Sequence, residues 1–392
     1  MENRKVNRWL ILVAAVVTNI ALGAGYMWSL FYGPLQAELA FSPNISWAYS
    51  LSFAMVPIAM IYFGPKVDEM GGKKIVFLAG LLFGGGMILS GLIKKEWMLY
   101  ITYGLITGFG IGTGYGTATA TSTKWFPDKK GLAGGLTAAG FGSGSLVLTP
   151  IVQPMIESRG IQSTFIIMGI ALGLVIIAAS FFMLKAPVAQ KTAQTNAATV
   201  ATNDKNYKEM MKEGNFWLLW VIYTLAATGG MMLIGHAAKI VNDYGFTVVM
   251  AAPTVIMTAA VANTAGRVGW GAISDKIGRY ITVVLMFAVS AAGLLLLNFN
   301  ELVGPTLAIV GILLVYLSFG GFLGAFPGIT AENWGAKNSA QNYGWMFTAY
   351  GIAAIAGPQI ATILGYSTAF IVSAIFSVVG LVLMLLFMSK NK

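Results

Sequence analysis

A single basic residue stands deep inside one of the apolar segments of this chain. Arg267 belongs to the stretch NTAGRVGW at 263–270, roughly 10 Å by helical rise from the polar end marked by Asp275. A cation in a membrane helix costs at least about 2.5–3.5 kcal/mol, so it requires a partner or a water-filled cavity. No acidic residue of that segment can pair with it. A guanidinium can hold a carboxylate through two parallel hydrogen bonds, which predicts an anion-binding site here.

Two further polar residues accompany this arginine. Asn263 precedes Arg267 by one helical turn, so it shares the same face and could hold either the carboxylate or the guanidinium. The alternative for Arg267 is a structural role, with its donors satisfied by helix carbonyls. His236 is the only histidine, and an unperturbed imidazole titrates near pH 6.5, so it could carry a coupling proton or bond the substrate. It lies roughly 20 residues into its segment, nearer the far end than Arg267, and could equally be an interhelical hydrogen-bonding residue.

The composition requires that the chain be solvated by lipid. Hydrophobic residues make up 57% and charged residues 10% of the 392, and the mean hydropathy is +0.76. No soluble fold could bury that much apolar surface. The chain has no cysteine, one histidine and 14 carboxylates, which leaves few groups for a metal site or for hydrolytic chemistry. We therefore expect neither an enzyme, nor a metal site, nor a cofactor.

Long apolar segments organise the chain into two equal sets. A membrane helix needs about 20 mostly apolar residues. Twelve such segments lie at 9–32, 46–63, 75–93, 98–121, 131–155, 164–184, 216–237, 248–273, 280–298, 303–329, 340–363 and 366–388. The predicted fold is an all-α membrane protein with an N-terminal six-helix bundle at 1–184 and a C-terminal one at 214–392. The polar segment 185–213 reads as a cytoplasmic linker with a short helix near 207–211.

A short polar phrase occurs once in each half. GPKVDEMGG starts at Gly64, and GAISDKIGR starts at Gly271, one repeat of 207 residues later. Each phrase has an aspartate four residues after its first glycine, Asp68 and Asp275, and a second glycine three residues further on. Two halves related in this way are typical of a duplicated transporter. We expect the two aspartates to act in gating, by capping a helix end or by pairing with nearby basic residues. We expect the first glycine of each phrase, Gly64 or Gly271, to act in gating with them.

Basic residues predict the orientation in the membrane. With a cytoplasmic N-terminus, 19 of the 24 lysines and arginines lie on the cytoplasmic face. The opposite face has only Lys94, Lys95, Arg159 and Lys239, and Arg267 is inside a helix. By the positive-inside rule both termini are cytoplasmic. The net charge of +10 is then a consequence of topology and of contact with anionic lipid, and no nucleic-acid partner is expected.

Together, the twelve segments, the central linker and the doubled loop resemble the major facilitator superfamily over essentially the whole chain. A narrower resemblance lies in KWFPDKKGLAGG at 124–135 and NYG at 342–344, which are similar to the oxalate/formate antiporter family and its monocarboxylate-transporter relatives. The resemblance implies a carboxylate carrier that works by alternating access. It would lie in a bacterial-type plasma or inner membrane, as a multi-pass protein and as a monomer.

The resemblance also implies residues of the binding site. In these families an arginine at the place of Arg267 binds the substrate carboxylate, and the pocket is lined by aromatic residues. The positions that fall near matching stretches are Tyr26, Tyr115, Phe141 and Phe319. Where the family's oxalate carrier has a lysine, this chain has Tyr350, so a second cation for a dicarboxylate is missing. Each of these aromatic residues could instead serve helix packing alone.

The predicted function is secondary active transport of a small monocarboxylate such as lactate, pyruvate or formate, with proton symport as the expected coupling. Two alternatives stay open. One is an antiporter of the oxalate/formate type, and the other is a transporter-like sensor that binds its ligand without turnover. The expected partners are a small carboxylate anion, a proton and membrane lipid.

Overall fold

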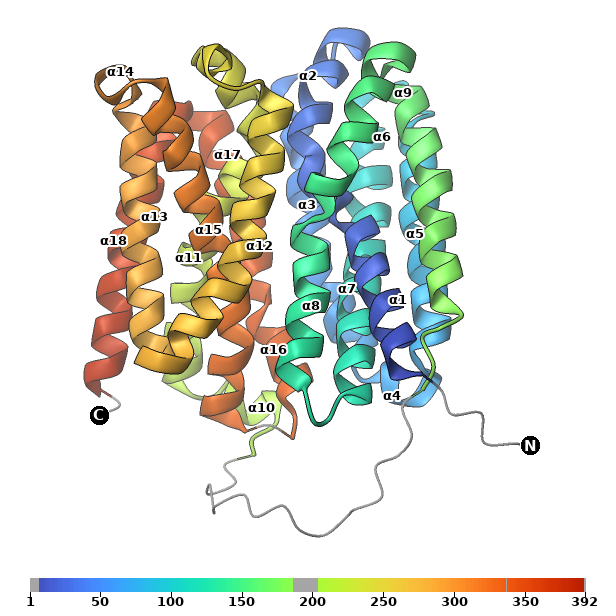
Figure 1. The fold of residues 1–392 in the computed structure, drawn as a ribbon, viewed down its shortest axis with the longest axis vertical. Coiled ribbons are helices and arrows are strands. Elements are labelled where there is room, and N and C mark those ends of the chain that lie inside the picture. The colour runs from blue at the N-terminus through green and yellow to red at the C-terminus, as the bar shows by residue number, and fades with distance from the viewer. Residues whose placement is uncertain (1–6, 186–203, 336, 391–392) are drawn as a thin grey trace.

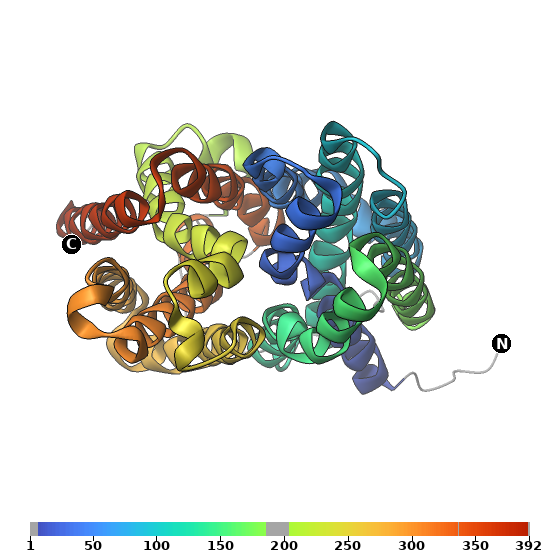
Figure 2. The ribbon, with the colours of Figure 1, turned by 90° about the horizontal axis from the view of Figure 1, so that it is seen from above.

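The structure, a computed structural model, describes residues 7–185, 204–335 and 337–390. These residues form helices and the turns between them, and no strand occurs among them. Figures 1 and 2 show the helices from α1 to α9 gathered on one side and those from α11 to α18 on the other. The described part of the chain therefore has the predicted all-α architecture of two helical bundles.

In the first bundle, two of the crossings depart locally from α-helical geometry. Its elements are α1 (Arg8–Leu22), η1 (Gly23–Met27), α2 (Trp28–Leu39), η2 (Pro43–Ile45), α3 (Ser46–Phe63), α4 (Lys66–Met70), α5 (Gly72–Ser90), α6 (Glu96–Leu99), η3 (Tyr100–Thr107), α7 (Gly108–Trp125), α8 (Lys130–Gly142) and α9 (Gly144–Ser180). The first crossing is interrupted by the 3-10 turn η1, and the fourth begins with the π-helical segment η3.

The second bundle follows the undescribed residues 186–203. Its elements are α10 (Tyr207–Met210), α11 (Gly214–Asp243), η4 (Phe246–Val248), α12 (Ala252–Ile277), α13 (Arg279–Asn298), α14 (Asn300–Val303), α15 (Pro305–Trp334), α16 (Ser339–Met346), α17 (Thr348–Leu364) and α18 (Tyr366–Lys390). The short helix expected near 207–211 is present as α10. The proposed boundaries at 184 and 214 stay a prediction, because most of the segment between them lies outside the described residues.

Nine helices among the described residues are long and apolar enough to cross a membrane. One of them, 131–180, contains two predicted segments, because the backbone at Gly160 leaves the helical region with φ 74° and ψ 168°. The predicted fourth and eighth segments are helical as α7 and α12 but are less apolar. Glycine and threonine make up much of α7, and α12 carries Asn263 and Arg267. The twelve expected segments are therefore all helical.

Equivalent glycines end equivalent helices in the two halves. Gly71 and Gly278, the second glycines of the doubled phrase, have φ/ψ of 76°/154° and 88°/150°. Gly160 and Gly365, which separate the last two crossings of each half, have 74°/168° and 76°/161°. These conformations are accessible almost only to glycine. The sequence repeat is thus matched by a repeat of backbone geometry.

A close contact between two glycines explains the breaks in the first and fifth crossings. A Cβ on Gly23 would lie 2.3 Å from the carbonyl oxygen of Phe141 and 3.0 Å from the Cα of Gly144. The turn η1 and the joint between α8 and α9 therefore meet backbone to backbone, as small residues allow in membrane proteins. These two breaks place Tyr26 and Phe141 against each other near the middle of the molecule.

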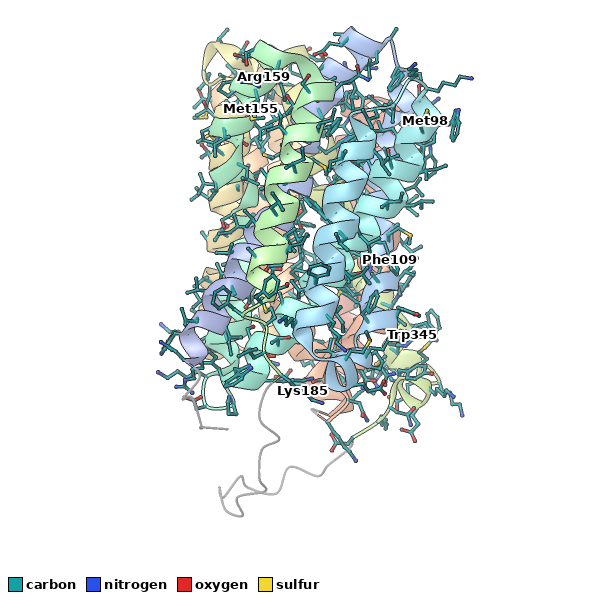
Figure 3. All side chains as sticks on the ribbon, turned by 90° about the vertical axis from the view of Figure 1, so that its right-hand side faces the viewer. Met98, Phe109, Met155, Arg159, Lys185 and Trp345 are labelled. Atoms are coloured by element: carbon teal, nitrogen blue, oxygen red, sulfur yellow. The ribbon has the colours of Figure 1, made fainter. Side chains whose placement is uncertain are left out.

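The two ends of the molecule can be told apart by their residues. Helix α1 begins and α18 ends at the lower end of Figure 1, which we call the terminal end. Figure 3 shows Lys185 and Trp345 toward this terminal end, and Met98, Met155 and Arg159 toward the opposite end.

Candidate functional site

Arg267 extends from α12 into the interior between the two bundles. Its exposed fraction is 7%, and it is the only buried lysine, arginine, aspartate or glutamate among the described residues. Its Nε donates to Oδ1 of Asn263 at 3.1 Å, which fixes the plane of the guanidinium. Within the described part of the chain, Nη1 and Nη2 have no hydrogen-bond partner. A buried donor without a partner is costly, and two such donors on one edge match the two oxygens of a carboxylate.

Two neighbours on α12 leave further polar atoms unbonded. Nδ2 of Asn263 and Oγ1 of Thr264 are buried, and neither has a partner among the described groups. Thr264 and Arg267 are three residues apart, so they lie on the same side of the helix. Three neighbouring side chains of one helix thus each have a buried polar atom without a partner.

The opposite wall of this region is formed by a glycine of the other bundle. A Cβ on Gly142, at the end of α8, would lie 3.1 Å from Nε of Arg267, 3.2 Å from Oγ1 of Thr264 and 3.4 Å from Oδ1 of Asn263. The absence of a side chain at Gly142 leaves the space that these polar groups occupy. Residues of both halves therefore border the space around the guanidinium.

Close packing of α12 against α15 holds the arginine at this depth. A Cβ on Gly266 would lie 2.0 Å from the carbonyl oxygen of Leu317, and one on Gly320 would lie 2.0 Å from that of Asn263. Such contacts exclude any side chain and bring the two helix backbones together. The position of Arg267 relative to α15 is consequently fixed by the backbone.

The predicted aromatic residues form one connected cluster beside the guanidinium. The hydroxyls of Tyr26 and Tyr350 are 3.3 Å apart, across the interface between the bundles. The ring of Tyr26 lies 4.9 Å from that of Phe141 and 6.2 Å from that of Phe319. Tyr115 lies 5.1 Å from Phe141. The structure thus brings together all five aromatic residues singled out in the sequence.

The three tyrosines of this cluster also lie near the guanidinium of Arg267. Tyr26, Tyr115 and Tyr350 interact electrostatically with Arg267. The hydroxyls of Tyr26 and Tyr115 lie within weak hydrogen-bonding reach of the guanidinium, but outside the geometry of a full hydrogen bond to Nη1 or Nη2. Phenol groups around an unpaired guanidinium can donate to a bound carboxylate or to a neighbouring hydroxyl or keto oxygen. The tyrosines can therefore complement the arginine chemically.

Sequence reasoning missed several members of this cluster. Phe347 stacks on Tyr350 with ring centroids 4.5 Å apart, and Phe53 stacks on Tyr26 at 5.3 Å. Val56 and Leu323 complete the apolar wall. The spacing of three between Phe347 and Tyr350 was the only available signal. The cluster encloses a cavity of about 10 Å³, room for one water at most, so a substrate can fit only when the halves move apart.

His236 lies away from the arginine. Its Nδ1 is 3.2 Å from the hydroxyl of Tyr366, and its ring is 5.4 Å from that of Tyr32. It is 2% exposed, and its Nε2 has no partner within the described residues. The structure therefore places His236 between the bundles in a separate aromatic group. Its part in transport stays a prediction.

The predicted gating residues lie at the end of α3, in the short helix α4 and in the last turns of α12. Asp275 is exposed, and no described side chain bonds to it. The side chain of Asp68 lies outside the described residues. A Cβ on Gly64 would lie 2.7 Å from the carbonyl oxygen of Met60, whereas one on Gly271 would meet nothing within 4 Å. Their gating role stays a prediction, and the structure gives Gly271 no steric reason to be glycine.

The described residues contain no group of three or more histidine, cysteine, aspartate or glutamate side chains able to hold an ion. The groups that this arrangement offers to a ligand are a buried guanidinium, two polar neighbours and phenol groups.

The comparisons with known proteins identify a superfamily of transporters. The sequence profile of the Major Facilitator Superfamily matches residues 11–358. The "Oxalate:formate antiporter" of Oxalobacter formigenes is 32% identical over 391 residues, which covers 96% of this chain and 90% of the relative. "Monocarboxylate transporter 13" of Rattus norvegicus is 22% identical over 307 residues, covering 77% and 69%.

Solved structures agree at the level of the fold. The crystal structure of a point mutant of the nucleoside transporter NupG superimposes with a TM-score of 0.74 at 15% identity, covering 98% of this chain and all of that one. A bacterial homologue of the lysosomal transporter Spinster, inward-facing and unoccupied, gives 0.68 at 14% identity and covers 98% of each chain.

Proposed function

Because this chain belongs to the Major Facilitator Superfamily, and so is a multi-pass membrane transporter, we propose that it carries a small monocarboxylate by alternating access. Lactate, pyruvate and formate are representative substrates. The relatives are transporters, which supports a carrier without enzymatic activity. The proposal concerns the substrate, the binding residues and the coupling.

The observation that carries the proposal is the pair of unbonded nitrogens on Arg267. Among the described residues this guanidinium is the only buried formal charge, and its two terminal nitrogens lack partners. One carboxylate would neutralise it and satisfy both donors. A dianion would bring a second charge into an aromatic, low-dielectric cavity with no cation to meet it. The charge count therefore favours a monocarboxylate.

Tyr350 supports the same conclusion. It lies in the aromatic cluster with its hydroxyl 3.3 Å from that of Tyr26, at the position where the resembling oxalate carrier has a lysine. A phenol can bond a hydroxyl or keto oxygen of the substrate but cannot neutralise a second carboxylate.

A second candidate is exchange of oxalate for formate or of similar carboxylates. It is favoured by the 32% identity to the "Oxalate:formate antiporter" over 96% of this chain. The two candidates share the arginine site and differ in the charge of the substrate, so a test of charge preference separates them.

We propose proton symport as the coupling, with both termini on the cytoplasmic side. Since the described spanning helices contain no buried carboxylate, the proton would move on His236 or with the acid form of the substrate. Uptake should rise as the external pH falls from about 7.5 to 5.5. If His236→Ala still accumulates substrate in response to acid, then His236 does not carry the proton.

The test of the proposed function is competition by oxalate against labelled lactate in proteoliposomes. The wild type should transport lactate and resist oxalate. In Tyr350→Lys, lactate transport should weaken, because two cations would face each other in the unliganded site. The same variant should gain relative affinity for oxalate, whose two charges would neutralise Arg267 and the new lysine. Preference of the wild type for oxalate, or no gain in the variant, would refute the assignment.

A further inference from the structure

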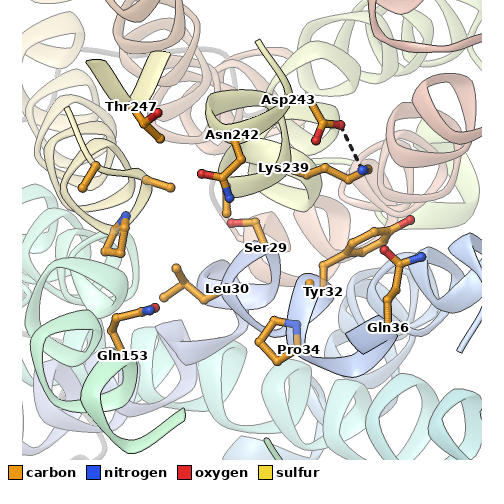
Figure 4. Close-up of a pocket in the computed structure, with 15 residues that line it drawn as sticks. Ser29, Leu30, Tyr32, Pro34, Gln36, Gln153, Lys239, Asn242, Asp243 and Thr247 are labelled. Carbon is orange, nitrogen blue, oxygen red and sulfur yellow. Dashed lines mark ion pairs between the residues drawn. The ribbon is translucent and has the colours of Figure 1, made fainter. Parts of the chain in front are cut away.

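A second cavity separates the bundles at the end opposite the termini. Its volume is about 430 Å³, against about 10 Å³ for the aromatic cavity. One wall comes from α2 and α9, and the other from the end of α11 and the start of α12 (Figure 4). Ala252, at its edge, precedes Arg267 by 15 residues on α12, about 22 Å along the helix. The cavity is therefore distinct from the arginine site and lies on the route toward it.

A buried, unpaired hydroxyl lies in the wall of this cavity on the side of the first bundle. Ser29 is 3% exposed, and its Oγ has no partner among the described groups. Figure 4 shows Ser29 beside the space between α2 and α11, with the side-chain amide of Asn242 reaching into the same space from the second bundle. A buried hydroxyl without a partner is uncommon, and a ligand held in the cavity would provide the missing hydrogen bond once the Ser29 side chain rotates toward it.

One lysine and one aspartate line the same cavity. Lys239 lines it and forms an ion pair with Asp243 at 2.9 Å, one turn further along α11. Their side chains are 40% and 43% exposed, so water screens the pair and a competing anion can exchange with the aspartate. The first residues of α12 also form part of the wall. That helix has 26 residues and no side-chain cap, and its free N–H groups favour an anion.

We propose that this cavity, lined by Ser29, Lys239 and Asn242, is a loading site that binds the small carboxylate before it reaches Arg267. The ammonium group of Lys239 attracts the anion, and the hydroxyl and the amide donate to its oxygens. Asp243 competes for the ammonium, which keeps binding weak and lets the anion move on. The choice of a carboxylate as ligand rests on the proposed function.

The absence of cysteine from the chain permits a direct test by thiol labelling. Thr247 lines the cavity and is exposed, so Thr247→Cys can report on its occupancy. We suggest measuring its rate of reaction with a membrane-impermeant maleimide in sodium lactate and in sodium chloride of equal ionic strength. The measurement is made in the Arg267→Ala background, where lactate cannot occupy the central site. Lactate should slow labelling up to about threefold when it fills two-thirds of the sites.

Matched variants decide what the protection means. Adding Lys239→Gln or Ser29→Ala should remove the protection, and Asp243→Asn should extend it to lower lactate concentrations. Leu302→Cys, which is 85% exposed and outside the cavity, should label at the same rate in both salts. No protection of Thr247→Cys, or protection that survives both Lys239→Gln and Ser29→Ala, would overturn the loading site. Protection in a protein that transports no lactate would refute the proposed function and leave the loading site standing.

Discussion

At the scale of residues, the site consists of polar atoms that the protein itself leaves unbonded. Nη1 and Nη2 of Arg267, Nδ2 of Asn263 and Oγ1 of Thr264 are buried together without partners in the described structure. Sequence reasoning predicted the first two residues, because a charge inside an apolar helix is too costly to be incidental. It missed Thr264 and Gly142. Threonines and glycines are common in these helices, and only the packing shows that Oγ1 of Thr264 lacks a partner and that Gly142 faces it.

The space at Gly142 should be required for binding. In Gly142→Ala the new Cβ would lie 3.1 Å from Nε of Arg267, so the guanidinium must shift. We expect the KM for lactate to rise several-fold in proteoliposomes. Gly135→Ala, on the same helix with nothing within 4 Å of its Cβ, is the matched control and should behave as wild type. Equal kinetics for both variants would show that this wall does not position the arginine.

At the scale of elements, the twelve apolar segments predicted from the sequence are all helical among the described residues, but the breaks within them were not predictable. The interruption at Gly23–Met27 depends on contact with Gly144, far away in the sequence. The sequence repeat indicated the doubled loops, and the structure shows why each loop needs a glycine. The position that needs glycine is the second one of each phrase, Gly71 or Gly278, where φ is positive.

Two alanine substitutions in the same phrase test which position requires glycine. Gly278→Ala forces a side chain into a conformation with φ 88°, which should destabilise the protein by about 1–3 kcal/mol. Gly271→Ala lies in a helix with open space around it and should be neutral or stabilising by up to about 1 kcal/mol. Thermal unfolding in detergent compares the two. A larger loss in Gly271→Ala would contradict the assignment of the strained position.

At the scale of the molecule, two bundles meet around one small aromatic cavity and one larger cavity at the end opposite the termini. The doubled phrase predicted the two halves, because duplicated loops imply duplicated bundles. It could not predict how the space between them is divided. That division depends on contacts between the halves, such as the pair Tyr26 and Tyr350, which no periodicity within one half encodes.

The central claim is that one guanidinium holds the substrate carboxylate. The most direct measurement is counterflow of labelled lactate in proteoliposomes containing wild type, Arg267→Lys or Arg267→Ala, at equal amounts of folded protein. Lysine keeps the charge but cannot form two parallel hydrogen bonds, so its rate should fall at least about tenfold. Arg267→Ala should show no counterflow above protein-free liposomes. Near-normal counterflow by either variant would contradict the account.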